Sequence, residues 1–126
     1  MIGSLRGVSA YAYGEPCDMR KSFNTLSAMV ANQLRRDLMS GDLFIFVGKT
    51  RKRAKVLYFD GTGLCLLAKR LEQGRFARPW EHSVDGVVSL TLSELALFLE
   101  GSDLIGRKSL APPTFDQKEL AVKISV

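Results

Sequence analysis

The sequence predicts a single α+β domain, with a mainly antiparallel sheet and two helices in the order β-α-β-β-β-β-α. Short apolar runs bounded by turn residues are typical of strands. Two stretches with apolar residues three or four positions apart are typical of helices. Short connections between the central strands favour antiparallel pairing. We expect this domain to span residues 1–104, followed by a C-terminal tail at 105–126.

The N-terminal part predicts one strand and one helix. Residues 5–13 contain alternating apolar and polar positions, which is the pattern of a half-buried strand. Asp18 stands where a helix N-cap is expected, and Ser40-Gly41 is a typical helix end. Between them runs one apolar stripe, which we interpret as a core face and which consists of Phe23, Leu26, Met29, Val30, Leu34 and Leu38.

Three strands are predicted next, at 43–47, 56–59 and 64–68. A polar connection joins the first two, and the glycine-rich turn Asp60-Gly61-Thr62-Gly63 joins the second to the third. We expect one face of the sheet to pack against both helices. The other face, or the tip of the hairpin at 49–53, would then be free to meet a partner.

The C-terminal part predicts a further strand and a second helix. Residues 75–78 are a candidate edge strand, 80–86 a loop and Val87–Leu90 a strand. Thr91 and Glu94 form a capping-box pattern. The helix that follows ends at Gly101, and its expected inward residues are Leu92, Leu95, Ala96 and Leu99. Residues 120–126 fit either a late strand or a disordered end.

Positive charge is concentrated in the middle of the chain. Residues 49–78 contain nine basic and two acidic residues, a net charge of +7, whereas the whole chain has +5. This balance indicates an anionic partner, with nucleic acid first and a membrane surface second. A solvated hairpin kept soluble by its charge is the alternative. The predicted phosphate-contacting residues are Lys49, Arg51, Lys52, Arg53, Lys55, Lys69, Arg70 and Arg75.

Several classes of function lack their sequence patterns. No apolar run approaches the ~20 residues of a membrane span, and the N-terminus lacks the apolar core of a signal peptide. Cys17, Cys65 and His82 are far apart without metal-ligand spacing, so we expect two structural thiols in a cytoplasmic protein and a surface histidine. We expect no metal or other cofactor, and neither a nucleophile elbow nor a phosphate-binding loop occurs.

Asp60 is the one acidic residue that suggests chemistry. It ends a strand, as the first metal-binding aspartate of ribonuclease-H-like nucleases does, but such sites need further carboxylates. The alternative is that Asp60 shapes a hairpin turn, because Asp-Gly is a leading turn pair. We favour the turn.

Four segments resemble the TnpB-type accessory protein, the product of the second open reading frame of the insertion-sequence family numbered sixty-six. They lie in the same order between Val8 and Asp103, and they read CDMRKSF at 17–23, GDLFIF at 41–46, DGTGLCL with AKRLEQGRF within 60–76, and LT, EL and LEG within 90–101. The resemblance implies a bacterial mobile element with a separate, larger DDE transposase. It also implies a non-catalytic accessory protein rather than an enzyme.

The preferred hypothesis is an accessory module of DNA transposition that contacts phosphates through the basic hairpin without reading sequence. The alternative is an adaptor that binds the transposase or another protein of the same element, with exposed Phe76, Trp80 or the tail as its anchor. A small nuclease that uses Asp60 is the third and least favoured hypothesis.

Overall fold

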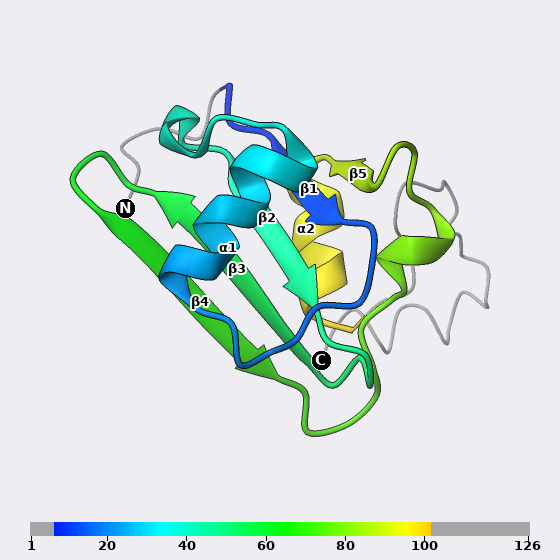
Figure 1. Ribbon diagram of the computed structural model, residues 1–126. Helices are drawn as coiled ribbons and strands as arrows, with labels where there is room; N and C mark the ends of the chain where they lie inside the picture. Colours follow the sequence, from blue (N-terminus) through cyan, green and yellow to red (C-terminus); the bar gives the residue numbers. More distant parts are fainter. Residues whose placement is uncertain (1–6, 102–126) are drawn as a thin grey trace.

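The computed structural model describes residues 7–101, and Figure 1 shows their path. Its strands are β1 (Ala10–Tyr13), β2 (Leu43–Val47), β3 (Arg53–Phe59), β4 (Leu64–Arg70) and β5 (Val87–Leu90). Its helices are α1 (Phe23–Met29), the π-helix η1 (Val30–Leu34), the 3₁₀ helices η2 (Leu38–Ser40) and η3 (Pro79–Glu81), and α2 (Leu92–Leu99). The predicted α+β class and element order are confirmed.

The strands form one five-stranded sheet in the order β4-β3-β2-β1-β5. β1 pairs in parallel with β2, and the other three pairings are antiparallel. The first strand of the chain therefore lies inside the sheet. Its Ala10 and Ala12 are fully buried, and the two edges are β4 and β5.

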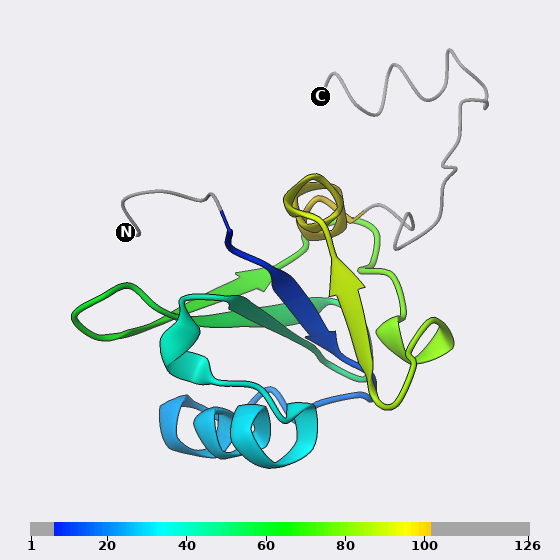
Figure 2. The same cartoon turned by 90° about the horizontal axis from the view of Figure 1, so that it is seen from above.

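The helices cover opposite faces of the sheet, so the expectation that both lie on one face is wrong. Figure 2 shows α1 with η1 on one side and α2 on the other. The residues of β2 face the two layers alternately: Phe44 and Phe46 belong to the α1-side core, and Ile45 and Val47 to the α2-side core. An unbroken apolar run is typical of a strand buried on both faces, because alternation is lost when neither face meets water.

Each helix contributes a small set of buried side chains. On the α1 side these come from α1 and η1, and on the α2 side Phe98 stacks on Phe76, with ring centres 5.5 Å apart. The fully or almost fully buried helix residues are Leu26, Met29, Val30, Leu34, Leu95 and Phe98. Ala96, predicted to face inward, is exposed.

The first helix begins and ends differently from the prediction. Its N-cap is Ser22, without a side-chain hydrogen bond, and Asp18 instead accepts hydrogen bonds from Arg20. It ends at Arg35, whose backbone is left-handed with φ 57° and ψ 45°, and the Arg36 N–H donates to the carbonyl of Val30 at 3.0 Å. Glycine usually occupies such a position, so the sequence carried no stop signal there.

The C-terminal part largely follows the prediction. Thr91 Oγ1 accepts the N–H of Glu94 at 3.0 Å and Glu94 Oε1 accepts the N–H of Thr91 at 2.8 Å, which confirms the capping box. Gly101 adopts φ 90° just beyond α2. Residues 75–78 form no strand, since Phe76 and Ala77 are buried beneath α2. The predictions for 105–126, including a late strand at 120–126, lie outside the described residues.

Within residues 7–101, no helix combines the length and the apolar character that crossing a membrane requires.

Candidate nucleic-acid interface

The antiparallel hairpins gather all eight predicted phosphate-contacting residues at one end of the sheet. Arg53 is the register partner of Arg70, so residues 49–55 and 69–75 lie side by side. We call this set the basic end: Lys49, Arg51, Lys52, Arg53, Lys55, Lys69, Arg70 and Arg75. What each side chain contacts decides how it can serve a ligand.

Three cations of the basic end fasten the segment after β4 to the turn between β2 and β3. Backbone bonds start this contact, because the N–H groups of Leu71 and Phe76 each donate to that turn at 2.8 Å. Side chains complete it through neutral carbonyl groups, which leave the positive charges uncompensated. Arg51 Nη1 donates to Phe76 O at 3.2 Å, Lys52 Nζ to Gly74 O at 3.0 Å and Arg75 Nε to Thr50 O at 3.2 Å.

Two lysines connect the sheet to the helical layers. Lys55 Nζ donates to the carbonyl of Lys21 at 2.7 Å, just before α1. Lys69 Nζ donates to the carbonyl of Leu99 at 2.6 Å, at the C-terminal end of α2. A cation is favourable there because the last carbonyl groups of a helix carry partial negative charge. Both lysines therefore have structural roles in addition to their charge.

Arg53 and Arg70 form an exposed pair within the basic end. They are direct cross-strand partners, and both are exposed. Like charges directly opposite one another destabilise a sheet. Arg70 Nη2 lies 3.4 Å from Glu72 Oε2, but both side chains are exposed, so this ion pair is worth little. A shallow groove of about 550 Å³ runs between these arginines and Met19.

Carboxylates neutralise little of this charge within the described residues. The ion pairs there are Arg20–Asp18, Arg70–Glu72 and Arg78–Glu81, so Arg70 is the single member of the basic end with a carboxylate partner. Lys49 is exposed at the tip of the turn. The cations nevertheless point in different directions, because alternate residues of β3 and β4 face different helical layers.

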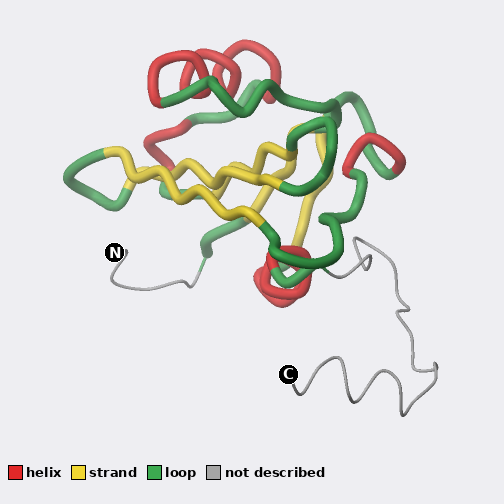
Figure 3. Tube along the Cα trace, turned by 90° about the horizontal axis from the view of Figure 1, so that it is seen from below, coloured by secondary structure: helices red, strands yellow, loops and turns green. Residues whose placement is uncertain are grey.

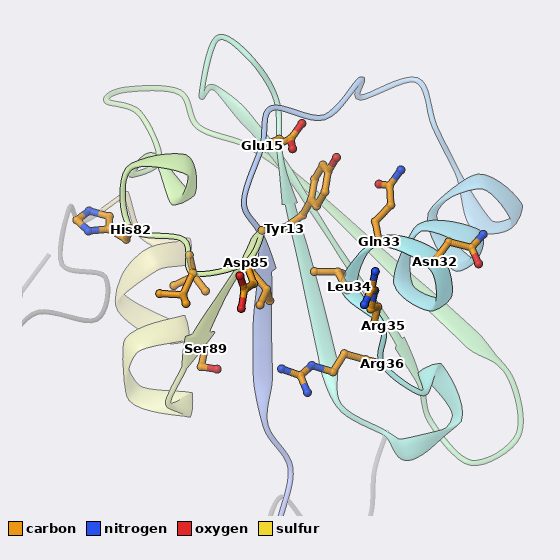
Figure 4. Close-up of a pocket in the computed structure, with 14 residues that line it drawn as sticks. Tyr13, Glu15, Asn32, Gln33, Leu34, Arg35, Arg36, His82, Asp85 and Ser89 are labelled. Atoms are coloured by element: carbon orange, nitrogen blue, oxygen red, sulfur yellow. The ribbon is translucent and has the colours of Figure 1, made fainter.

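A second, larger hollow lies at the opposite edge of the sheet. It has a volume of about 1310 Å³ and separates the end of η1 from β5 and the loop before it (Figure 4). Arg35 and Arg36 line one wall, while Glu15 and Asp85 supply carboxylates. The Arg36 guanidinium also lies 4.2 Å from the centre of the Tyr11 ring. The sequence does not predict this hollow, because its pattern indicates a helix that continues to Ser40-Gly41, whereas the helical layer ends at Arg35.

Asp60 is occupied by its own turn. Its Oδ1 accepts the N–H groups of Thr62 at 2.9 Å and Gly63 at 3.0 Å, and the Cys65 thiol lies 3.5 Å from its Oδ2. The backbone N–H donors of Thr62 and Gly63, followed by Cys65, lower the pKa of Asp60 to about 2. Residues 7–101 contain no cluster of three or more potential metal-ligating side chains. The turn interpretation therefore accounts for Asp60.

The remaining candidates have ordinary environments. Cys17 is buried, and burial raises the pKa of its thiol. His82 is exposed, as predicted. The proposed anchor Phe76 is fully buried and Trp80 is half-buried against the α2-side core, so the prediction that Phe76 is exposed is wrong. Phe76 and Ala77 form too short an apolar stretch for the sequence alone to indicate that they are buried.

Comparison with known proteins agrees with the resemblance. The model of the family described as "IS66 Orf2 like protein" matches residues 8–109. The chain belongs to this family. IS66 Orf2-like proteins are accessory proteins of transposition, and this chain is one of them.

Two relatives come from Sinorhizobium fredii (strain NBRC 101917 / NGR234). The "Uncharacterized protein y4jC" is 35% identical over 116 residues, which cover 90% of this IS66 Orf2-like chain and 97% of the relative. The "Uncharacterized protein y4hO" is 33% identical over 103 residues, which cover 82% and 88% of the two chains. No solved structure matches this IS66 Orf2-like chain.

Proposed function

We propose that this IS66 Orf2-like protein assists transposition by binding DNA phosphates at its basic end, without catalysing a reaction. The observation that carries the proposal is the cross-strand pair Arg53–Arg70. Two guanidinium groups side by side repel one another, and a phosphate between them replaces this repulsion with charge-assisted hydrogen bonds. Planar guanidinium groups suit phosphate because they donate two parallel hydrogen bonds.

The remaining cations of the basic end would strengthen the contact between the Arg53–Arg70 pair and DNA through their electrostatic attraction for phosphates. Lys49 is free to reach a phosphate directly, whereas Arg51, Lys52 and Arg75 keep their carbonyl partners and contribute charge. Phosphate contacts fix the position of a protein on DNA but carry no sequence information. We therefore expect similar affinity for duplexes of unrelated sequence.

Salt dependence of DNA binding tests this proposal. The double variant Arg53→Gln/Arg70→Gln removes the central pair, and Arg36→Gln/Arg78→Gln removes the same charge elsewhere. Affinity for a labelled duplex would be measured by fluorescence anisotropy at several salt concentrations, after circular dichroism has confirmed folding. Because the two arginines share one phosphate in this proposal, their loss should reduce the log–log salt slope by about 0.9.

The Arg36/Arg78 variant shows whether DNA affinity depends on the basic end itself or only on the net charge of the protein. We expect the Arg36/Arg78 variant to keep nearly the whole salt slope. Equal losses in both double variants, or binding by the native protein that does not respond to salt, would contradict the proposal.

A non-catalytic role is supported by the environment of Asp60, whose carboxylate is engaged by its own turn. An element that carries Asp60→Asn should therefore transpose at nearly the native frequency. Loss of transposition with a correctly folded variant would favour the nuclease hypothesis instead.

Binding to the element's transposase is the second candidate function. It is favoured by the hollow in Figure 4, whose lining includes Arg35, Asp85 and Val84, which is 73% exposed. A pull-down with nuclease present separates the two functions. A complex that survives nuclease treatment and the Arg53/Arg70 substitutions would favour an adaptor, whereas its loss would favour bridging by DNA.

A further inference from the structure

Within residues 7–101, the edge strand β4 lacks the usual protection of a sheet edge. Its seven residues pair with β3 in unbroken register from Arg53↔Arg70 to Phe59↔Leu64, so there is no bulge. It contains no proline, and its two charges stand together at its C-terminal end. Natural edge strands are commonly short, bulged or charged along their length, because free N–H and C=O groups invite another strand. The other edge, β5, has four residues.

The backbone bonds around β4 indicate which of its residues face outward. Asp60 N donates to Gly63 O at 3.0 Å, and Leu71 N donates to Lys52 O at 2.8 Å. Hydrogen-bonded pairs alternate along an antiparallel ladder, so residues 65, 67 and 69 direct their N–H and C=O groups to β3. Residues 64, 66, 68 and 70 therefore direct theirs away from the sheet. Figure 3 shows β3 and β4 extending together as a hairpin.

The side chains of this edge are apolar where an edge is usually polar. Leu64 is 36% exposed and Leu67 is 49% exposed. Leu66 is partly buried against the α1-side core, and Ala68 beside it is exposed. The strand thus offers a backbone ladder and an apolar strip together, which is the combination that strand addition uses.

We propose that β4 pairs antiparallel with β4 of a second copy of this chain, about a two-fold axis that passes between the two Leu67 residues. In this register residues 64, 66, 68 and 70 of one copy lie opposite residues 70, 68, 66 and 64 of the other. All four outward-facing residues are paired, which gives about eight backbone hydrogen bonds. The interface uses the same surface on both copies, as a two-fold dimer requires.

Charge selects this arrangement. Lys69 and Arg70 of one copy meet the apolar start of β4 and the Asp60 turn of the other, where no cation stands. A parallel arrangement would place Arg70 beside Arg70, and like charges in register are destabilising. The antiparallel register separates the two Arg70 positions by six residues, or roughly 20 Å along the strands. Both basic ends can therefore belong to one dimer without strong repulsion.

The mass of the full-length protein in solution tests the proposal first. We expect light scattering to give twice the chain mass of 13.9 kDa. Leu67→Lys places two lysines opposite one another at the axis and should shift the protein to the monomer. Ser89→Lys makes the matched change on the other edge and should leave the dimer intact. A native monomer at every concentration, or dissociation by Ser89→Lys alone, would overturn the proposal.

Disulfide cross-linking tests the register. Opposed residues between hydrogen-bonded pairs have Cα atoms about 4.5 Å apart, within the range that a disulfide spans. Leu67→Cys in a Cys65→Ser background should therefore cross-link on oxidation, whereas Leu64→Cys in the same background should not, and the remaining Cys17 is buried. Cross-linking at position 64 alone would refute this register.

Hydrogen exchange tests whether other residues of the same chain, rather than a second copy, cover the outer edge of β4. The N–H groups of Leu66 and Ala68 face outward. If the dimer forms, their protection from exchange should therefore increase as the protein concentration rises. A monomer in which both amides remain protected would overturn the proposal, because the chain itself would then cover β4.

Discussion

Replacing Gly14 by alanine should destabilise this protein more than a single methyl group normally does. A Cβ at this position would lie 2.6 Å from Ser83 Cβ, 2.8 Å from the carbonyl carbon of Gly86 and 2.9 Å from its oxygen. Relief to ordinary contact requires backbone shifts of about 0.6–0.8 Å, because rotating a side chain moves neither the Gly86 backbone nor the Ser83 Cβ. The same shift would lengthen the 2.8 Å hydrogen bond from Gly14 N to Gly86 O.

The size of the effect follows from these contacts. Overpacking typically costs about 1–3 kcal/mol and a weakened hydrogen bond about 1 kcal/mol. Alanine returns about 0.4–1 kcal/mol by restricting the unfolded chain. We therefore expect the free energy of unfolding to fall by about 1–3 kcal/mol, with a melting temperature lower by about 4–8 °C for each kcal/mol.

Urea unfolding followed by the fluorescence of Trp80, the one tryptophan in the chain, measures this change. The matched control is Gly63→Ala, because a Cβ at Gly63 meets nothing within 4 Å. We expect the Gly63 variant to unfold at or slightly above the native midpoint. The reasoning is refuted if Gly14→Ala and Gly63→Ala unfold at the same urea concentration with equal slopes.

Three further predictions concern a helix cap, a turn and the basic end. Thr91→Ala removes the capping box and should lower the free energy of unfolding by about 1 kcal/mol, measured in urea. The pKa of Asp60 is lowered from 3.8 to about 2, so its stabilising effect is complete above pH 3.8 and is lost as the pH falls through 2. Asp60→Asn should remove this part of the acid sensitivity, as seen in unfolding midpoints between these pH values. Glu72→Gln frees its arginine partner and should tighten DNA binding at low salt, with affinities that converge at high salt.

The sequence predicted the strands and the helix cap, which depend on local pattern. It did not predict that the two helices cover opposite faces of the sheet. The runs at 43–47 and 87–90 and the Thr91 cap lie where expected, because apolar length and capping chemistry are local. The unbroken apolar run in β2 is also the pattern of a strand buried on both faces, which is how the structure places it. The end of η1 carried no signal, since Arg35 takes a conformation that glycine usually adopts.

The same division applies to the candidate interface. The sequence indicated that cations gather at one hairpin, and antiparallel pairing places them together. It did not indicate that Lys55 and Lys69 donate to carbonyl groups of residues 21 and 99, because such contacts require the tertiary fold. Likewise, Phe76 belongs to the core only because α2 returns over it.

The interior position of β1 has a consequence for synthesis on the ribosome. Ala10 pairs with Leu43 on one side and with Leu90 on the other. β1 is synthesised before the other described strands, but it can complete its pairing only after β5 has been synthesised. The β2–β3–β4 meander connects near neighbours and can assemble while the chain is still growing. A nascent chain that stops before residue 87 therefore leaves β1 with one unpaired edge, a state in which early release would favour aggregation.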